Sequence, residues 1–300
     1  MEVNFHKNPH RIPLVYIIAG EPSGDILGAK LIKALKHLTN GNINFLGIGG
    51  LEMRKTGFVS LFPINELSVM GITEIIPRLP RLLKRIKQTA DDIVKIQPDI
   101  LVTIDSPEFT LRIAKNVKRI ALPLIHYVAP SVWAWRSSRA KKMEKFVDHI
   151  LTLFPFEPPY FTKVGLKATF VGHPVIESGA MNGNPESFRK NHGILNNKKV
   201  IVLLPGSRVG EVTKHIKIFS KALEILRTEI KNFHIVCIVN DQTANLVVKS
   251  ALSWPFPYTI TSNSDIKYDA MACGNIALAA SGTVALELAC VGTPSIIAYK

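Results

Sequence analysis

The chain has 300 residues, enough for about two domains of ordinary size and for a substantial apolar core. Its composition, 47% hydrophobic and 20% charged residues, excludes a mainly disordered, collagen-like, coiled-coil or disulfide-scaffold protein. An excess of 37 lysines and arginines over 23 aspartates and glutamates gives a formal net charge of +14, which favours anionic partners such as nucleic acid, phosphorylated metabolites or an acidic membrane surface.

The chain carries three cysteines without CxxC or metal-ligand spacing, namely Cys237, Cys273 and Cys290. We interpret them as buried free thiols in a reducing compartment. Residues 1–11 lack the apolar core of a secretory signal, and no run reaches the roughly 18–20 apolar residues of a membrane-spanning helix. We therefore expect a cytoplasmic protein whose contact with a bilayer is peripheral.

In the first half of the chain, short β-branched runs alternate with amphipathic stretches of helical length. The apolar runs predict strands at residues 13–19, 43–47, 100–104, 122–128 and 150–153. The stretches between them predict helices at residues 25–38, 77–96, 107–117 and 137–146. Because the strands are continuously apolar, we expect them to be parallel and covered by helices on both faces of the sheet.

A turn-rich segment interrupts this pattern at residues 172–197, which favours a connection between domains. The alternation then resumes, with strands expected at 200–204, 234–239, 276–279 and 295–299 and helices at 211–230, 241–251 and 284–291. The sequence therefore predicts an α/β protein with two Rossmann-like domains, at residues 1–175 and 198–300, joined by a linker at 176–197. Since Lys300 directly follows a predicted strand, we expect the second domain to be incomplete.

In open α/β sheets, ligands bind beyond the carboxyl ends of the strands, and this rule selects the loop at residues 20–25. Gly20 and Gly24 allow a tight backbone, Ser23 is a candidate helix cap, Asp25 begins the helix, and Glu21 is expected to face the crevice. A capped turn between strand and helix explains every residue here except Glu21.

A second loop begins with Asp105, directly after an apolar strand and ahead of a proline that opens a helix. A carboxylate in this position can accept a proton from a substrate hydroxyl, because general-base catalysis needs it within hydrogen-bond reach of the attacking oxygen. The alternative is that Asp105 caps its helix, and the residues alone leave both interpretations open.

Two further loops, in the second half, have the composition of anion-binding sites. Gly206 and Ser207 bring backbone amides near an anion, and Arg208 offers a planar fork for a phosphate. The loop at Ser281, Gly282 and Thr283 suits a diphosphate at a helix N-terminus, and Glu287 lies one turn further on, within reach of a ribose. A surface arginine after a turn is the structural alternative for Arg208.

The chain has no GxGxxG, Walker A, HExxH or GxSxG motif, which removes the usual sequence support for hydride transfer, NTP hydrolysis, zinc peptidase and hydrolase chemistry. Paired anion-binding loops in two domains instead indicate a nucleotide-sugar enzyme. His126 and Arg136 follow a strand near the expected crevice and are candidate substrate contacts. We predict no metal site and no cofactor.

Residues 67–87 combine an apolar cluster with adjacent cations, the composition of an interfacial membrane contact. The alternative is an ordinary helix with a core stripe and a solvated basic face. The candidate membrane residues are Leu67, Val69, Met70, Ile72, Ile75, Ile76, Arg78 and Arg81. Recognised nucleic-acid motifs are absent, so we expect no nucleic-acid partner.

Between Leu14 and the end of the chain, the sequence contains in order AGEPSGDILGAKLIKAL, GIGGLEMRKTGF, LSVMGITEII, PDILVTIDSPEFTLRIAK, HYVAPSVWAWR, FVGHPV, LLPGSR and SGTVALE. With this combination the chain resembles the lipid-A-disaccharide synthase family. The resemblance implies a GT-B glycosyltransferase fold with two domains facing a cleft, the first for the acceptor and the second for a UDP-sugar. It also implies an inverting, metal-independent transfer from UDP-2,3-diacylglucosamine to the 6-hydroxyl of 2,3-diacylglucosamine 1-phosphate.

The resemblance implies roles for the loop residues. Asp105 would be the base, Glu21 would orient the acceptor or the base, and Arg208 would neutralise charge on the departing UDP. Gly282, Thr283 and Glu287 would hold the diphosphate and ribose. The patch around Val69–Ile76 would bring the protein to the cytoplasmic face of the inner membrane.

Members of the family are expected to continue past Tyr299 with helices that contact the donor and are exchanged between the subunits of a homodimer. Two rival interpretations stay open: a GT-B enzyme of another UDP-sugar class, such as a UDP-GlcNAc epimerase or a cell-wall glycosyltransferase, and an inactive remnant that binds nucleotide or membrane.

Overall fold

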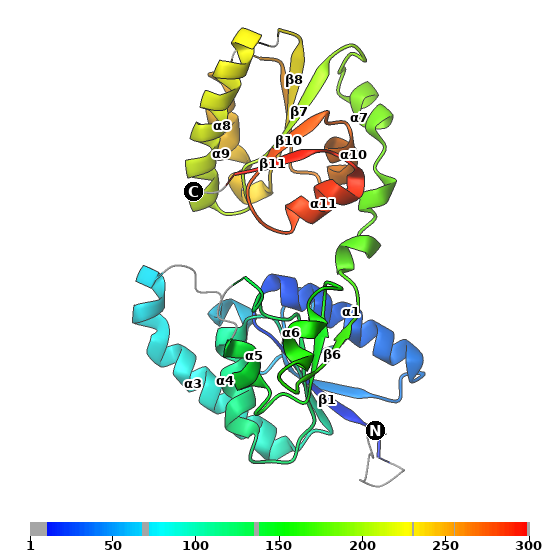
Figure 1. The fold of residues 1–300 in the computed structure, drawn as a ribbon, viewed down its shortest axis with the longest axis vertical. Coiled ribbons are helices and arrows are strands. Elements are labelled where there is room, and N and C mark those ends of the chain that lie inside the picture. Colours follow the sequence, from blue (N-terminus) through cyan, green and yellow to red (C-terminus); the bar gives the residue numbers. More distant parts are fainter. Residues whose placement is uncertain (1–10, 68–71, 135–137, 230, 255, 299–300) are drawn as a thin grey trace. The chain divides into compact units, whose positions relative to one another are not determined.

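The computed structural model describes residues 11–67, 72–134, 138–229, 231–254 and 256–298, with only the backbone described for residues 72–78. The chain divides into two compact units, Met1–His173 and Pro174–Lys300. Each is an α/β unit with one parallel sheet, as the sequence predicts (Figure 1).

The first unit contains a six-stranded sheet in the order β2-β1-β3-β4-β5-β6, in which every pairing is parallel. Its strands are β1 (Leu14–Ala19), β2 (Asn44–Ile48), β3 (Ile100–Ile104), β4 (Leu124–Tyr127), β5 (His149–Thr152) and β6 (Lys167–Phe170). Its helices are α1 (Pro22–Leu38), α2 (Leu51–Arg54), η1 (Ile64–Glu66), α3 (Ile72–Ile96), α4 (Pro107–Val117), α5 (Ser138–Met143) and α6 (Pro158–Thr162).

Apolar side chains cover both faces of this sheet. One core joins alternate strand residues such as Tyr16 and Ile18 to side chains of α3 and α4, including Ile93 and Phe109. The other core joins the opposite alternation, including Ile17, to side chains of α1 and α2. Because side chains alternate along a strand, a strand that is buried on both sides must be apolar throughout, and this explains the continuous run in β1.

The second unit contains a five-stranded parallel sheet in the order β11-β10-β7-β8-β9. Its strands are β7 (Lys199–Leu204), β8 (Phe233–Ile238), β9 (Tyr258–Thr261), β10 (Ile276–Ala279) and β11 (Ser295–Ile297). Its helices are η2 (Pro174–Glu177), η3 (Ala180–Asn182), α7 (Pro185–Asn191), α8 (Val209–Glu229), α9 (Asp241–Ala251), α10 (Lys267–Ala272) and α11 (Val284–Val291).

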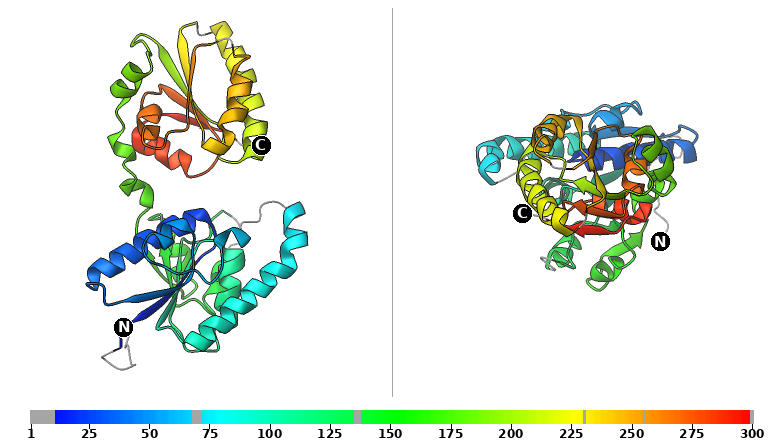
Figure 2. Two further views of the ribbon diagram at one scale, coloured as in Figure 1. Left: turned by 180° about the vertical axis from the view of Figure 1, so that it is seen from behind. Right: turned by 90° about the horizontal axis from the view of Figure 1, so that it is seen from above.

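The helices of the second unit cover both faces of its sheet. Helices α8 and α9 lie side by side on one face, with Val212, Phe219 and Val247 in their shared core (Figure 2). Residues of α7, α10 and α11, such as Phe188 and Leu288, pack on the other face.

The structure places residues 174–197, which include the predicted linker, inside the second unit. Phe188 of α7 and Ile194 are buried in the same core as Val200 and Val202 of β7, so this segment folds onto the sheet it precedes. The Arg189 guanidinium also donates to the carbonyl oxygens of Leu195 and Cys273, at 3.2 Å each. The boundary between the two units therefore lies at residue 173, near the start of the turn-rich segment, and helix α7 belongs to the second unit.

Candidate functional site

The strand order of the first sheet reverses between β1 and β3. The chain leaves β1 towards β2 on one side and leaves β3 towards β4 on the other. The loops after these neighbouring strands diverge, which opens the carboxyl edge of the sheet at the position where ligands bind in open α/β folds. The predicted loop at residues 20–25 and Asp105 both lie at this point.

Asp105 follows β3 and is half-buried. Its amide donates to the carbonyl oxygen of Tyr127 at 2.9 Å. Its Oδ1 accepts a hydrogen bond from the amide of Ser106 at 2.7 Å, and its Oδ2 accepts a longer bond from the hydroxyl of Ser23 at 3.4 Å. Ser106 occupies the N-cap position of α4, so the structure does not give Asp105 the ordinary capping position. The carboxylate is oriented by both loops of the reversal point.

The backbone around Asp105 is held in an unusual conformation. Asp105 and Ser106 have φ angles of +51° and +46°, a region that residues other than glycine rarely adopt. The buried hydroxyl of Thr110 donates to the carbonyl oxygens of Asp105, at 2.8 Å, and Ser106, at 3.1 Å. Such strain persists only where neighbours enforce it. Thr110 was not predicted as a site residue, because a threonine in a first helical turn has no distinctive pattern.

Gly20 is required by close approach, and Gly24 is tightly packed. A Cβ on Gly20 would lie 2.4 Å from the Cβ of Ser106, and a Cβ on Gly24 would lie 3.3 Å from the carbonyl oxygen of Ile104. Gly20 therefore allows the first loop to pack directly on Ser106 of the second, and Gly24 allows α1 to approach the end of β3.

Glu21 is the half-buried N-cap residue of α1, and its side chain does not cap that helix. Ser23, predicted as a candidate cap, lies inside the helix. Asp25 is buried, and its carboxylate accepts hydrogen bonds from the amides of Gly50, Glu52 and Met53 at 2.7, 2.9 and 3.1 Å. Asp25 thus binds the free amides at the N-terminus of α2.

His126, predicted to follow a strand near the crevice, lies within β4 and is fully buried on the face that packs against the α3 and α4 core. Its Nδ1 pairs with the hydroxyl of Thr103 at 2.8 Å, and its Nε2 has no hydrogen-bond partner among the described residues. Burial lowers the pKa of His126 to about 3, with a smaller contribution from Arg139, so the imidazole is neutral. Arg136 lies outside the described residues.

The second unit contains a cavity of about 570 Å³ at the carboxyl ends of β7, β8, β9 and β10. It brings together six predicted residues, Gly206, Ser207, Ser281, Gly282, Thr283 and Glu287. Gly206 and Gly282 have φ angles of +123° and +145°, which exclude most other residues. The sheet order of this unit reverses between β7 and β10, so the cavity occupies the position expected for a ligand.

Arg208 follows Ser207 at the start of α8, and its side chain is more than half exposed. Its Nη1 donates to Oε1 of Glu211 at 3.0 Å. Glu211 also lines the cavity, and its Oε2 lies 3.0 Å from the position of a Cβ on Gly206. The guanidinium is therefore held on the loop that carries the glycine and serine amides.

Glu287 projects from α11 into the cavity and is paired with a lysine. Nζ of Lys267 lies 2.7 Å and 2.8 Å from its two carboxylate oxygens, and the hydroxyl of Tyr268 donates to Oε1 at 3.2 Å. Burial and the neighbouring Glu287 carboxylate raise the pKa of Tyr268, with burial the larger cause. Lys267 was not predicted, because a lone lysine in a short polar stretch carries no motif.

Asn240 and His215 fix the backbone of the loop that carries Ser207. Nδ2 of Asn240 donates to the carbonyl oxygen of Ser207 at 2.7 Å, while its Oδ1 accepts from the amide and hydroxyl of Thr243 at 3.0 and 2.8 Å. Buried His215 pairs through Nδ1 with the carbonyl oxygen of Pro205 at 2.8 Å. An asparagine between a strand and a helix was the available sequence signal for Asn240.

Most of the predicted membrane patch is not described. Val69 and Met70 lie outside the described residues, and only the helix backbone is described for Ile72, Ile75, Ile76 and Arg78. Leu67 is half-buried and packs against the first core, so it is less exposed than the sequence predicts.

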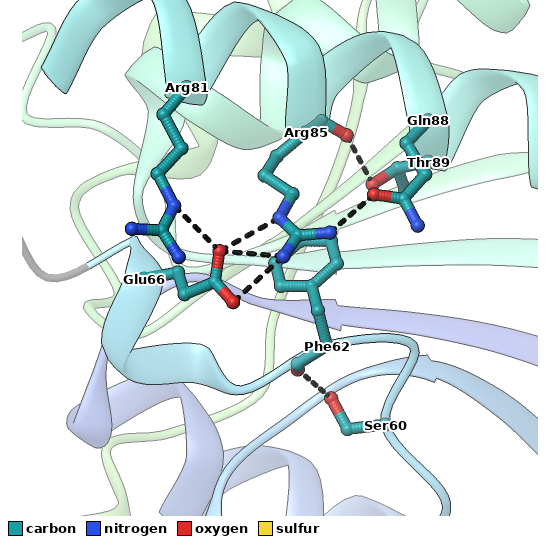
Figure 3. A network of polar contacts seen from close by, with 7 residues as sticks. All are labelled: Ser60, Phe62, Glu66, Arg81, Arg85, Gln88 and Thr89. Carbon is teal, nitrogen blue, oxygen red and sulfur yellow. Dashed lines mark hydrogen bonds and ion pairs between the residues drawn. The ribbon is translucent and has the colours of Figure 1, made fainter.

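A network around Glu66 attaches the middle of α3 to η1 (Figure 3). Arg85 donates from two nitrogens to the Glu66 carboxylate, and Arg81 donates through Nε to the same group at 3.1 Å. The guanidinium of Arg85 lies 4.5 Å from the ring centroid of Phe62. Hydrogen bonding by Arg85 is the largest cause of the lowered pKa of Glu66. Arg81 keeps a side-chain exposure of 65%, so its cation remains accessible.

The three cysteines are free thiols, with Cys237 and Cys273 buried and Cys290 half-buried. Within the described ranges, no group of three or more histidine, cysteine, aspartate or glutamate side chains is arranged to bind a metal ion. No helix in the described part of the chain combines the length and hydropathy needed to span a bilayer.

Comparison with known proteins identifies the family. The model of the lipid-A-disaccharide synthetase family matches residues 15–300. The lipid-A-disaccharide synthase of Rhodospirillum centenum is 49% identical over 290 residues, which cover 96% of this chain and 72% of that protein. The corresponding protein of Paramagnetospirillum magneticum is 46% identical and is covered to 74%.

Solved structures share the fold at much lower identity. The Staphylococcus aureus MnaA–UDP structure has a TM-score of 0.63 at 13% identity, covering 95% of this chain and 78% of that one. Acinetobacter baumannii MurG has a TM-score of 0.58 at 11% identity, covering 96% of this chain and 79% of that one. These likenesses show the GT-B fold alone. The family match and the close relatives go further, and together they show that the chain belongs to the lipid-A-disaccharide synthetase family.

Proposed function

We propose that this chain joins UDP-2,3-diacylglucosamine to 2,3-diacylglucosamine 1-phosphate by an inverting displacement, giving lipid A disaccharide 1-phosphate and UDP. The names of its close relatives support this reaction. The observation that carries the mechanism is the Asp105 carboxylate, held by hydrogen bonds from Ser106 and Ser23 at the reversal point of the first sheet.

In this proposal, Asp105 is the general base. The acceptor's 6-hydroxyl oxygen attacks the anomeric carbon of the donor while Asp105 takes the hydroxyl proton. The bond between that carbon and the diphosphate oxygen breaks, and its electron pair leaves with UDP. Because attack occurs opposite the leaving group, the α-linked donor gives a β-linked product. Glu21, beside Ser23 at the start of α1, would orient the acceptor.

The cavity of the second unit would hold the UDP portion of the donor. Its glycine-bearing loops at Gly206 and Gly282 place backbone amides at helix N-termini, which suit a diphosphate. Arg208 would neutralise charge on the departing UDP, an interaction that strengthens as the transition state forms. Glu287 would accept hydrogen bonds from the ribose hydroxyls, with Lys267 fixing the orientation of its carboxylate.

Both proposed substrates carry acyl chains, so the protein must reach a membrane surface. The patch predicted around Val69–Ile76, continued by exposed Leu79 and Leu83 of α3, would insert among lipid acyl chains. The neighbouring cations and the net charge of +14 would attract anionic headgroups. We therefore propose peripheral attachment at the cytoplasmic face of the inner membrane. A homodimer is the assembled form that the family resemblance implies.

The test of this function is a transfer assay. The chain is incubated with both diacylated substrates, and released UDP and disaccharide are measured together. We expect one UDP for each disaccharide and no consumption of UDP-GlcNAc. A folded chain that consumes UDP-GlcNAc, or that releases UDP without forming disaccharide, would contradict the proposal.

A further inference from the structure

Four aromatic side chains form a cluster at the carboxyl ends of β4, β5 and β6. Trp133 follows β4, Phe154 and Phe156 follow β5, and His173 follows β6. The ring centroids of Trp133 and Phe156 are 5.4 Å apart, those of Phe154 and Phe156 are 5.5 Å apart, and those of Phe154 and His173 are 5.6 Å apart. Trp133 and Phe156 are 46% and 47% exposed, which is unusual for such large apolar groups held together in one cluster.

A buried carboxylate holds this cluster in place. Glu157 is 4% exposed and accepts hydrogen bonds from the amides of Leu153, at 3.0 Å, and Phe154, at 2.9 Å. The side chain of Trp133 donates a further hydrogen bond to it. Burial raises the pKa of Glu157, and the three hydrogen bonds act in the opposite direction. Glu157 therefore fixes the Trp133 ring and the backbone that leads to Phe156.

The ring geometry favours one class of ligand. Trp133 and Phe156 meet at an interplanar angle of 86°, so their exposed surfaces form the two walls of a corner. A corner encloses a flexible polymethylene chain on two sides, whereas stacking on a sugar needs one flat open face. Rigid rings bind such a chain with little loss of side-chain entropy.

The cluster lies on the same sheet edge as Asp105. The amide of Asp105 donates to Tyr127 of β4, and the amide of Val128 donates to Leu151 of β5, so the three strands remain paired up to this edge. Strands in a sheet are about 5 Å apart, which places β5 about 10 Å from β3. An acceptor whose hydroxyl is at Asp105 could extend an acyl chain over that distance.

We propose that Trp133 and Phe156 bind an acyl chain of the acceptor, 2,3-diacylglucosamine 1-phosphate. This subsite rests on the proposed function and adds the part of the first unit that recognises chain length. Each buried methylene is expected to lower the acceptor KM by up to about fourfold until the corner is filled.

The experiment compares acceptors of increasing acyl length at saturating donor. We expect the KM of the unmodified protein to fall with length. We expect Phe156→Ala to raise the KM for long-chain acceptors by about tenfold, to leave short-chain acceptors almost unchanged, and to preserve kcat. Leu38→Ala, at an exposed apolar residue of α1, is the matched control and should follow the unmodified protein. Trp133→Phe keeps a ring but loses the donor to Glu157, and serves as the second variant if Phe156→Ala unfolds.

The outcomes separate this inference from the proposed function. Absence of transfer by the unmodified, folded protein would count against the function, and direct calorimetric binding of the same acceptor series would then decide the subsite. Equal dependence on chain length in Phe156→Ala and the unmodified protein would overturn the subsite while leaving the function intact. The subsite would also be overturned if Phe156→Ala sediments less with anionic vesicles while its KM depends on acyl length as in the unmodified protein. That result would assign the rings to contact with the bilayer.

Discussion

Gly20 lies against Ser106 so closely that a Cβ on Gly20 would sit 2.4 Å from the Ser106 Cβ and 2.5 Å from its Oγ. Ser106 is the neighbour whose amide donates to the Asp105 carboxylate. Through this contact, the loop after β1 sets the position of the residue proposed as the base.

The Gly20→Ala variant tests this contact. The added methyl must displace Ser106, so we expect at least a tenfold loss of transfer rate and a loss of about 1–3 kcal/mol in the free energy of unfolding. Both are measured on the purified variant, by UDP release and by denaturant unfolding.

A second substitution provides the control. Ser106 has a φ of +46°, which glycine accepts readily, and Ser106→Gly removes the colliding Cβ and Oγ. The double variant Gly20→Ala/Ser106→Gly should therefore recover most of the lost stability. If it is as unstable as Gly20→Ala alone, the close approach is not the reason for glycine at this position.

Asn240→Ser tests the support of the loop that carries Ser207. Serine can still cap α9, but its side chain is too short to reach the carbonyl oxygen of Ser207. We expect UDP affinity to fall by about tenfold, the usual cost of one lost hydrogen bond at a binding site, with little change in Tm. Isothermal calorimetry with UDP and thermal unfolding measure the two quantities.

Thr243→Val is the matched variant for Asn240→Ser, because it removes a hydroxyl bond to Asn240 Oδ1 but leaves the bond to Ser207. It should lower Tm and leave UDP affinity unchanged. Reduced affinity in Thr243→Val with normal affinity in Asn240→Ser would refute the assignment of Asn240 as a positioning residue.

Arg208→Ala should weaken UDP binding by about 10–100-fold, because a hydrogen bond to a charged group contributes roughly 1.5–3 kcal/mol. Transfer should fall by more than binding, since the charge on the leaving diphosphate grows in the transition state. Arg208→Lys should be intermediate, because lysine keeps the charge but loses the planar fork. Arg227→Ala, an exposed residue near the other end of α8, makes the same charge change and should bind UDP normally.

The buried His126 predicts a dependence of stability on pH. Its folded-state pKa of about 3 lies below the value of 6.5 expected when unfolded, so between these pH values the unfolded chain binds a proton that the folded chain does not. The stability contributed by neutral His126 is therefore complete above pH 6.5 and is lost as the pH falls towards 3.

The predicted loss of stability is checked by denaturant unfolding of the unmodified protein and of His126→Gln across pH 4–8. The carboxylates contribute equally to the pH dependence of the two proteins, so the difference between them reports His126. We expect the unmodified protein to lose stability more steeply below pH 6.5. Parallel curves for the two proteins would show that His126 titrates normally in the folded state.

The sequence predicts the strands that are apolar throughout, because burial on both faces leaves a continuous run. β3, β10, α4, α9 and α11 have the predicted bounds. Strands β6 and β9 were missed because both lie at sheet edges, where KATF and YTIT mix polar with apolar residues. Helix α3 was predicted to start at Pro77, a residue type typical of a first helical turn, yet it begins at Ile72.

The candidate site was predictable where a glycine, a carboxylate or an arginine lies in the segment between a strand and the helix that follows it. Six of the predicted residues line one cavity: five come from the loops after β7 and β10, and Glu287 comes from α11. Residues that act through contacts distant in sequence were missed. The bond from Asn240 to Ser207 joins two loops, and the pair between Lys267 and Glu287 joins helices α10 and α11. His126 was predicted to follow its strand near the crevice, yet it lies within β4, where the core buries its side chain.

Asp105→Asn tests the central claim most directly, because it keeps the size of the side chain and removes its basicity. Transfer between the two diacylated substrates is followed by UDP release, and UDP affinity is measured on the same preparation. We expect the rate to fall by about 10²–10⁴-fold, the usual contribution of a general base, while UDP affinity stays within about twofold. Transfer by Asp105→Asn at the rate of the unmodified protein would contradict the assignment of Asp105 as the base.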